Sequence, residues 1–189
     1  MLNDPYGKRL YLTASERHAF LQTAMKMSGD IRSFCEILHF TGCRISEALN
    51  LTVDRIDLEN EVVVFETLKK RKTGVFRSVP VPSNLLNILE LVHHIRKPGK
   101  LNRKLWSWSR VTAWRHIKVV MAEARIQQGP HTSPKGLRHG YGVNAISSGV
   151  PLNMLSKWMG HSAIEITAIY TNAVGSEQKQ ISARMWESI

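Results

Sequence analysis

The sequence predicts an α+β protein that is mainly helical and carries a small antiparallel β-hairpin or sheet near residues 61–82. Two observations lead to this class. Apolar residues recur at intervals of three and four along most of the chain, which is the spacing of amphipathic helices. Two short β-branched stretches, EVVVFET and VFRSVPVP, interrupt this pattern and flank a turn that contains Gly74.

The chain of 189 residues has the length of one domain, and 43% hydrophobic residues are enough for a sizeable core. It contains no internal repeat, low-complexity tract or linker to a second domain. We therefore expect a single domain over residues 1–189, with 1–12 as a loose lead-in.

The first helix is predicted to follow the stretch TASE and to reach about Met27. Thr13 and Glu16 have the spacing of a capping box, in which each side chain bonds to the other's backbone N–H. The residues expected to face inward are Phe20, Leu21, Ala24 and Met25.

A second helix is predicted in IRSFCEILHF, where Ile31, Phe34, Cys35 and Leu38 follow the i, i+3, i+4, i+7 pattern. The residues TG at 41–42 end it, and CRISEALNL resumes as a helix.

The hairpin comes next. Val75, Val79 and Val81 alternate along its second strand and should share one face. Helices are then expected over 84–95 and 110–124, joined by a basic linker.

The last third of the chain is predicted to be helical and punctuated by turns. A helix over Leu137–Ser147 ends at SSGVP, and Pro151 suits the first position of the next helix, which stops at Gly160. Ser162 and Glu165 have capping-box spacing and should open a short helix.

The short helix should end near Tyr170, and a final helix is expected over about 176–186.

The charge of the chain points to a polyanionic partner. Its formal net charge is +11, and nucleic acid is the commonest large polyanion, with an anionic membrane surface as the rival. No long apolar run, amphipathic anchor or signal peptide favours a membrane or secreted protein. The two cysteines, Cys35 and Cys43, are too few for a disulfide framework and suit buried thiols in a cytoplasmic protein.

Several kinds of catalytic site are absent from the sequence. No HExxH, paired CxxC or Asp-rich cluster suggests a metal site, no GxxxxGK[ST] suggests nucleotide hydrolysis, and no GxSxG suggests a serine hydrolase. A reaction without metal or nucleotide remains, or no reaction.

Isolated polar residues follow small or helix-ending residues at several places, and each has two interpretations. The guanidinium of Arg44, after TGC, could grip two phosphate oxygens or could pair with Glu47 on the surface. Lys72 could reach a DNA groove from the hairpin turn or could belong to a solvated charged edge. Tyr170 could be reactive or could be a core residue with a hydrated hydroxyl.

Taken together, these residues form an ordered set. The stretches TGCRISEALNL, KKRKTGVFRSVPVP, KGLRHGYGVNAISSGVPLNMLSKWMGH and AIYTNA resemble the tyrosine recombinase, or phage integrase, family over almost the whole chain. The family order is Arg, a hairpin Lys, then His or Lys three residues before a second Arg, then His, and finally the nucleophilic Tyr. The matching residues here are Arg44, Lys72, Lys135, Arg138, His161 and Tyr170.

This resemblance implies the tyrosine-recombinase catalytic-domain fold, also found in DNA breaking-rejoining enzymes. Lys135 departs from the histidine that most relatives carry in an HxLRH motif. The first motif arrives at residue 42, so we expect the chain to lack an N-terminal core-binding domain. Its layout is similar to that of the short inversion recombinases that switch fimbriae.

The resemblance also implies a reaction that needs no metal, ATP or other cofactor. Tyr170 attacks a DNA phosphodiester, a 5′-hydroxyl leaves, and a 3′-phosphotyrosyl bond conserves the energy of the broken one. Arg44 and Arg138 would hold the phosphate oxygens, with His161 as a further donor. Lys72 would protonate the leaving oxygen.

The resemblance leaves two functions for Lys135, which would either accept the proton of Tyr170 or only add positive charge. His139 would support the site through hydrogen bonds, and Gly136 would let the backbone approach DNA. The residues expected to contact flanking DNA phosphates are Lys69, Lys70, Arg71, Arg77, Lys100 and Arg103.

The expected partner is double-stranded DNA, bound by a homo-tetramer at the synapse and by a monomer in free solution, with accessory DNA-binding proteins as further candidates. The helix over 176–189 would be exchanged between subunits. The outcome could be integration, excision, inversion or resolution. Two other functions remain open: a DNA-binding regulator without catalysis, and a type IB topoisomerase.

Overall fold

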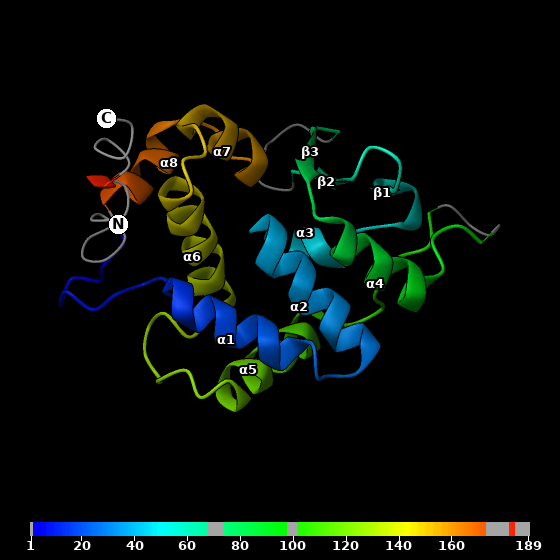
Figure 1. Cartoon of the computed structure of the whole chain (residues 1–189), viewed down its shortest axis with the longest axis horizontal. Helices are drawn as coiled ribbons and strands as arrows, with labels where there is room; N and C mark the ends of the chain where they lie inside the picture. Colours follow the sequence, from blue (N-terminus) through cyan, green and yellow to red (C-terminus); the bar gives the residue numbers. More distant parts are fainter. Residues whose placement is uncertain (1, 68–73, 98–101, 173–181, 184–189) are drawn as a thin grey trace.

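The computed structural model describes residues 2–67, 74–97, 102–172 and 182–183. Within these residues the fold is mainly helical with one small antiparallel sheet, as the sequence predicted (Figure 1). The elements in chain order are α1 (Ala14–Ala24), α2 (Gly29–Thr41), α3 (Ile45–Leu49), the 3₁₀ helix η1 (Val53–Arg55), β1 (Ile56–Asp57), β2 (Val62–Glu66), β3 (Phe76–Pro80), α4 (Ser83–His93), α5 (Arg110–Glu123), α6 (Pro134–Ser147), α7 (Leu152–Met159), α8 (Glu165–Ala168) and the 3₁₀ helix η2 (Ile169–Asn172).

The expected hairpin is the larger part of a three-stranded sheet in the order β1-β2-β3. Val63 faces Val79 and Phe65 faces Arg77 across β2 and β3. The buried face alternates as expected, because Val63, Phe65 and Val79 are fully buried while Ser78 between them is exposed.

The apolar residues form two separate clusters. The main core lies between the sheet and helices α1 to α5, and it includes Phe20, Phe34 and Leu85. A smaller cluster lies beside α6, α7 and η2. Its buried members are Leu2, Tyr11, Val143, Ala145, Leu155, Met159 and Tyr170.

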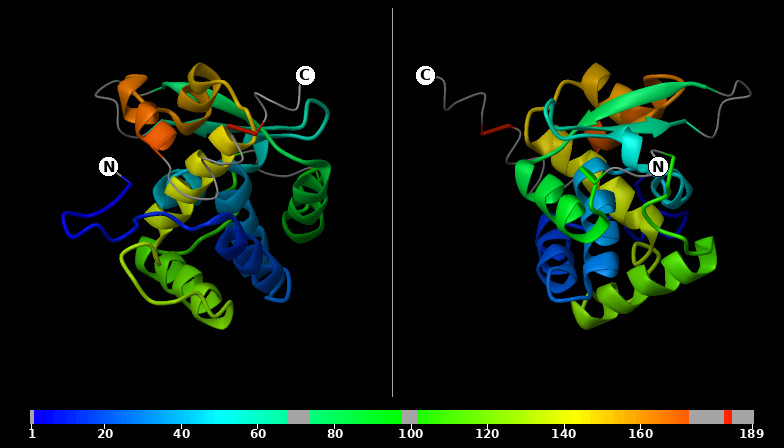
Figure 2. Two further views of the ribbon diagram at one scale, coloured as in Figure 1. Left: turned by 60° about the vertical axis from the view of Figure 1, so that its left-hand side comes forward. Right: turned by 90° about the vertical axis from the view of Figure 1, so that its right-hand side faces the viewer.

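Helix α6 connects the two ends of the molecule. It runs from α1 to the group formed by α7 and α8 (Figure 1), and it contacts α1, α2, α7 and η2. In both views of Figure 2 the sheet and α7 lie at one end of the molecule and α5 at the other. Since α7 also packs on β3, the end of α7 is fixed between the sheet and α6.

Helix ends follow local chemistry. The capping box of Thr13 and Glu16 is present, and Gly42 and Gly160 end α2 and α7 in the left-handed conformation, which glycine adopts without strain. Helix α6 begins three residues earlier than expected because the hydroxyl of Ser133 accepts a bond from the backbone of Gly136.

Three details of the prediction were wrong, and a fourth concerns residues that mostly lie outside the described part of the chain. Met25 is exposed, because α1 ends at Ala24 and the next residue leaves its buried face. Pro151 caps α7 instead of forming its first residue. Ser162 does not cap α8, which starts after Ile164 without a side-chain cap. Except for 182–183, the final helix expected over 176–186 lies outside the described residues.

None of the helices in the described part of the chain is long and apolar enough to cross a membrane.

Candidate active site

A cavity of about 740 Å³ opens between α3, α6 and the segment that follows α7. Five of the six residues in the family order fall in the described part of the chain, and all five line this cavity, together with His139. The predicted residues among those that line the cavity are Arg44, Lys135, Arg138, His139, His161 and Tyr170.

Arg138 is held in α6 by main-chain acceptors. Its Nη1 donates to the carbonyl of Gly42 at 2.6 Å and its Nη2 to that of Met159 at 2.7 Å. A guanidinium has five N–H donors, so three remain for a ligand. Burial, and then the nearby charge of Arg44, lower the pKa of Arg138 to about 10, so that it stays charged near neutral pH.

Arg44 lies directly before α3 and is 25% exposed. Its Nη1 donates to Oε1 of Glu47 at 2.8 Å, and its backbone N–H donates to Oε2 at 2.8 Å. The two interpretations of Arg44 from sequence therefore describe one arrangement, in which the ion pair orients a guanidinium that also lines the cavity.

Glu47 itself is buried and pairs with a second arginine, Arg77, at 2.7 Å. Burial raises the pKa of this carboxyl, but the charges of Arg77 and Arg44 outweigh it and hold the pKa below its usual range. Glu47 is thus an anion shared by one cavity arginine and one buried arginine.

His161 follows the left-handed turn at Gly160. A hydrogen bond of 2.8 Å joins its Nδ1 to Oγ1 of Thr167, which leaves Nε2 as the ring nitrogen able to bind a ligand. Burial, and then the charges of Arg138 and Arg44, lower the pKa of His161 to about 4. The imidazole is therefore neutral at pH 7 without a bound anion.

Tyr170 in η2 is 1% exposed. Its ring lies parallel to that of His161, with 6.3 Å between the centroids, and its hydroxyl is 3.1 Å from Nδ1 of His139. Burial raises the pKa of Tyr170 to about 12 although Arg138 and Arg44 oppose it. Gly142 makes room for the ring, because a Cβ there would lie 2.6 Å from it.

Among the side chains that the structure describes, His139 is the one that forms a hydrogen bond with the hydroxyl of Tyr170. Burial, and then the charges of Lys135 and Arg138, lower the pKa of His139 to about 4. Lys135 is exposed at the edge of the cavity. Sequence alone suggested only a supporting function for His139, and the direct contact with Tyr170 depends on how η2 packs on α6.

Comparisons with known proteins identify the family of the chain. The model of the phage integrase family matches residues 11–176. The chain belongs to the phage integrase family. Tyrosine recombinase XerA of Pyrococcus furiosus is 27% identical to this family member, and the match covers 92% of the present chain. Tyrosine recombinase XerD of Mycobacterium leprae is 32% identical, and that match covers 74% of the present chain. The matches span 60% and 47% of those two relatives.

Solved structures share the fold of this phage integrase family member. A crystal structure of XerA recombinase superposes with a TM-score of 0.79 at 20% identity, covering 93% of this chain and 64% of that one. The catalytic domain of bacteriophage HP1 integrase gives a TM-score of 0.66 at 22% identity, covering 92% and 93%.

Two expectations for this family member need correction. Arg77 was expected to contact DNA, but it is buried and its guanidinium is bonded to Glu47, Thr67 and Trp158. The alternation of β3 carried this signal, since Arg77 lies between Val75 and Val79 on the buried face.

Gly136 was expected to let the backbone approach DNA. A Cβ there would lie 1.8 Å from the carbonyl oxygen of His131, and the Gly136 carbonyl accepts a bond from Leu12. The glycine therefore serves close packing within the protein.

The other expected DNA contacts divide into two groups. Arg103 is exposed and donates a hydrogen bond to the carbonyl of His93. The expected DNA contacts that lie outside the described part of the chain are Lys69, Lys70, Arg71 and Lys100, and the expected catalytic Lys72 lies outside it as well. Within the described ranges, no three His, Cys, Asp or Glu side chains are grouped so that they could hold a metal ion.

Proposed function

We propose that this chain cuts and rejoins double-stranded DNA at specific sites through a covalent bond between Tyr170 and a 3′ phosphate. One observation carries the proposal: two arginines, a histidine and a tyrosine from four separate segments line a single cavity. A basic chain with a net charge of +11 would draw DNA to that cavity.

Arg44 and Arg138 would bind the non-bridging oxygens of the phosphate. Both are permanently charged at neutral pH, and their planar guanidinium groups suit paired oxygens. The charge on those oxygens grows as the phosphorus becomes five-coordinate, so fixed donors stabilise the transition state more than the ground state. Nε2 of His161 would supply a further donor.

The chemical step would begin with Oη of Tyr170 attacking the phosphorus while the bond from phosphorus to O5′ breaks. The phenolic proton would pass to Nδ1 of His139, which is neutral at pH 7 and 3.1 Å away. The negative charge of bound DNA would raise the pKa of that imidazole and favour the transfer.

We assign the proton of the leaving O5′ atom to Lys72, as in the family the sequence resembles, and give exposed Lys135 a purely electrostatic function. Rejoining reverses the step: a 5′-hydroxyl attacks the phosphotyrosyl bond and Tyr170 regains its proton. The energy of the original bond is kept throughout, so neither ATP nor another cofactor enters the balance.

Recombination of two duplexes needs four such sites, and we propose a homo-tetramer at the synapse that forms from monomers. Accessory DNA-binding proteins and exchange of the segment 176–189 belong to the same proposal. Ile164 and Ile166, which are exposed on the segment after α7, would accept that exchanged segment. A DNA substrate and two free thiols, Cys35 and Cys43, favour the cytoplasm.

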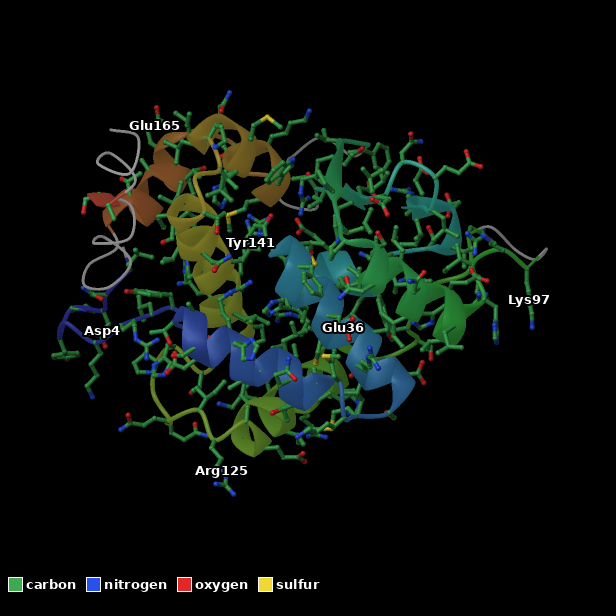
Figure 3. The ribbon with its side chains drawn as sticks, in the orientation of Figure 1. Asp4, Glu36, Lys97, Arg125, Tyr141 and Glu165 are labelled. Carbon is green, nitrogen blue, oxygen red and sulfur yellow. The ribbon has the colours of Figure 1, made fainter. Side chains whose placement is uncertain are left out.

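The test uses nicked suicide duplexes tiled across the DNA that flanks the gene. The wild type should form a detergent-resistant adduct with one duplex, and Tyr170→Phe should form none. Tyr141→Phe is the matched control, because burial also raises the pKa of Tyr141 to about 12 while its ring packs on Gly42. In Figure 3 Tyr141 projects from α6 on the side of α2 and α3.

Other outcomes would overturn the proposal. DNA binding without an adduct from any of the three proteins would favour a regulator. Relaxation of supercoiled DNA by the wild type without strand exchange would favour a type IB topoisomerase. An adduct that survives in Tyr170→Phe but not in Tyr141→Phe would move the nucleophile to α6.

A further inference from the structure

We propose that Arg77 is a positioning residue that sets the geometry of Arg44 and His161, acting through Glu47 and through the end of α7. This inference rests on the proposed function and adds to it a residue that does not line the cavity. Arg77 is 6% exposed, so it can contact neither solvent nor DNA appreciably.

The first link runs from Arg77 to Arg44. Nη2 of Arg77 donates to Oε2 of Glu47 at 2.7 Å, and Nη1 approaches Oε1 at 3.4 Å. The same carboxylate accepts Nη1 and the backbone N–H of Arg44. The position of the Glu47 carboxylate, and through it the direction of the Arg44 guanidinium, therefore depends on Arg77.

The second link runs from Arg77 to His161. Nε of Arg77 donates to the carbonyl of Trp158 at 2.7 Å, three residues before His161. A Cβ on Gly160 would lie 3.0 to 3.1 Å from the guanidinium, so the turn that leads to His161 is packed directly on Arg77. The end of α7 is thereby held at a fixed distance from Glu47.

A third bond fixes Arg77 itself. Its Nη1 donates to Oγ1 of Thr67 at 3.2 Å, and the backbone N–H of Thr67 pairs with the carbonyl of Val75. The guanidinium also lies over the ring of Phe65, 5.1 Å from its centroid. Arg77 is thus anchored at the base of the turn between β2 and β3.

Only arginine can make this set of contacts. Its planar fork reaches Glu47, Thr67 and Trp158 in three directions, whereas a lysine places one compact charge at a single point. A buried ion pair is often no more stabilising than apolar residues of the same volume, so stability alone does not call for arginine here. The presence of arginine is explained if its contacts with Glu47, Thr67 and Trp158 hold Arg44 and His161 in position.

The test compares Arg77→Lys with a matched control, Arg17→Lys. Arg17 is as deeply buried, at 5% exposure, but it donates to the carbonyls of His39 and Leu137 and has no link to Glu47. Single-turnover cleavage of the suicide duplex, DNA affinity and thermal unfolding would be measured for each. All rates are taken below the unfolding transition of the least stable variant.

We expect Arg77→Lys to bind DNA as the wild type does and to cleave it on the order of a hundredfold more slowly, the loss that a small misplacement of catalytic groups causes. Glu47→Gln should likewise bind DNA as the wild type does and cleave it more slowly. This variant replaces Arg77→Lys in the test if Arg77→Lys fails to fold. Arg17→Lys should lower the melting temperature but keep the cleavage rate.

A double-mutant comparison separates positioning from general damage. When Arg44 is already replaced by Ala, Arg77→Lys should lower the cleavage rate by a smaller factor than it does in the wild type. The effect through Arg44 is then already gone, and only the effect through His161 remains, because the effects of coupled residues are not additive. The inference is overturned if folded Arg77→Lys and Glu47→Gln cleave at the wild-type rate, or if the losses from Arg77→Lys and Arg44→Ala multiply in full. Absence of a wild-type adduct would instead overturn the proposed function.

Discussion

The two halves of the cavity are built differently. One half is backed by an arginine frame, which we define as Arg44, Glu47, Arg77 and Arg138. Ion pairs to the buried Glu47 join Arg44 and Arg77, and Arg138 is held separately by bonds to main-chain carbonyls. Charged hydrogen bonds of this kind are about twice as strong as neutral ones.

The other half is the nucleophile segment, residues 161–172. It contains a helix of four residues and a 3₁₀ turn, and its reactive side chains are each held by one neutral hydrogen bond, from His161 to Thr167 and from Tyr170 to His139. Tyr170 belongs to the smaller apolar cluster, and exposed residues such as Glu165 line the outer side of α8 (Figure 3).

This difference suggests that one half of the cavity is rigid and the other is movable. In the proposed function, the half that binds phosphate is already formed in the free protein, whereas Tyr170, at 1% exposure, would have to be uncovered before it could attack. Short segments with few buried contacts open at low free-energy cost. We therefore expect residues 161–172 to be the half that moves.

The largest expected effect comes from breaking the arginine frame. Arg138→Ala should lower the cleavage rate on the order of 10²–10³-fold, as loss of a transition-state donor does. It also leaves the carbonyls of Gly42 and Met159 without their donor, at a cost of about 1–3 kcal/mol each. Single-turnover cleavage and chemical denaturation measure the two effects.

Arg138→Lys is the control for charge alone. If it cleaved at the wild-type rate, the forked geometry of the frame would be irrelevant to the reaction.

A smaller effect is expected from crowding the nucleophile while the frame stays intact. Gly142→Ala places a Cβ 2.6 Å from the ring of Tyr170 and should push η2 away from α6. Overpacking of this kind costs about 1–3 kcal/mol, which corresponds to a change of roughly fivefold to 150-fold in the population of the packed state. Adduct formation should change while DNA affinity does not.

Loss of DNA affinity together with cleavage in Gly142→Ala would show that the two halves are not independent.

Thr167→Val tests one neutral bond of the nucleophile segment. It keeps the buried shape at this position but removes the hydroxyl that orients His161. A neutral hydrogen bond contributes about 0.5–1.5 kcal/mol, so the cleavage rate should fall by up to about tenfold. A loss as large as that of Arg138→Ala would contradict the contrast between the halves.

The pH dependence of stability should involve both halves of the cavity. His139 and His161 have pKa values lowered to about 4, so between pH 6.5 and 4 the unfolded chain binds more protons than the folded one. The free energy of unfolding should be largest above pH 6.5 and fall as the pH drops toward 4. His39 and His93, with pKa values lowered to about 2 and about 4, add to the same trend.

Denaturation curves at pH 7 and pH 5 measure this loss, and His161→Gln should reduce it. An unchanged pH dependence in that variant would show that His161 is not held neutral in the folded state.

The sequence predicted the fold class, most helices and the residues of the cavity because these depend on local periodicity and on an ordered set of motifs. It misplaced residues whose environment is set by tertiary packing. Arg77 was counted by its charge among DNA contacts, although its position between Val75 and Val79 already placed it on the buried face.

The contact of His139 with Tyr170 could not be foreseen, because the two residues are 31 positions apart and meet only when η2 packs on α6. Gly136 shows the same limit: its neighbour is the carbonyl of His131, which the local sequence does not place there. Neither of these two contacts follows from the local pattern of a single element.

The most direct test of the contrast is hydrogen exchange of the full chain, free and bound to its suicide duplex. We expect amides of α3, β3 and α6, which carry Glu47, Arg77 and Arg138 of the arginine frame, to exchange slowly in both states. Amides of α8 and η2 should exchange much faster in the free protein and slow down when the adduct forms. Equal protection of both halves in the free protein would contradict the division between a preformed frame and a movable nucleophile.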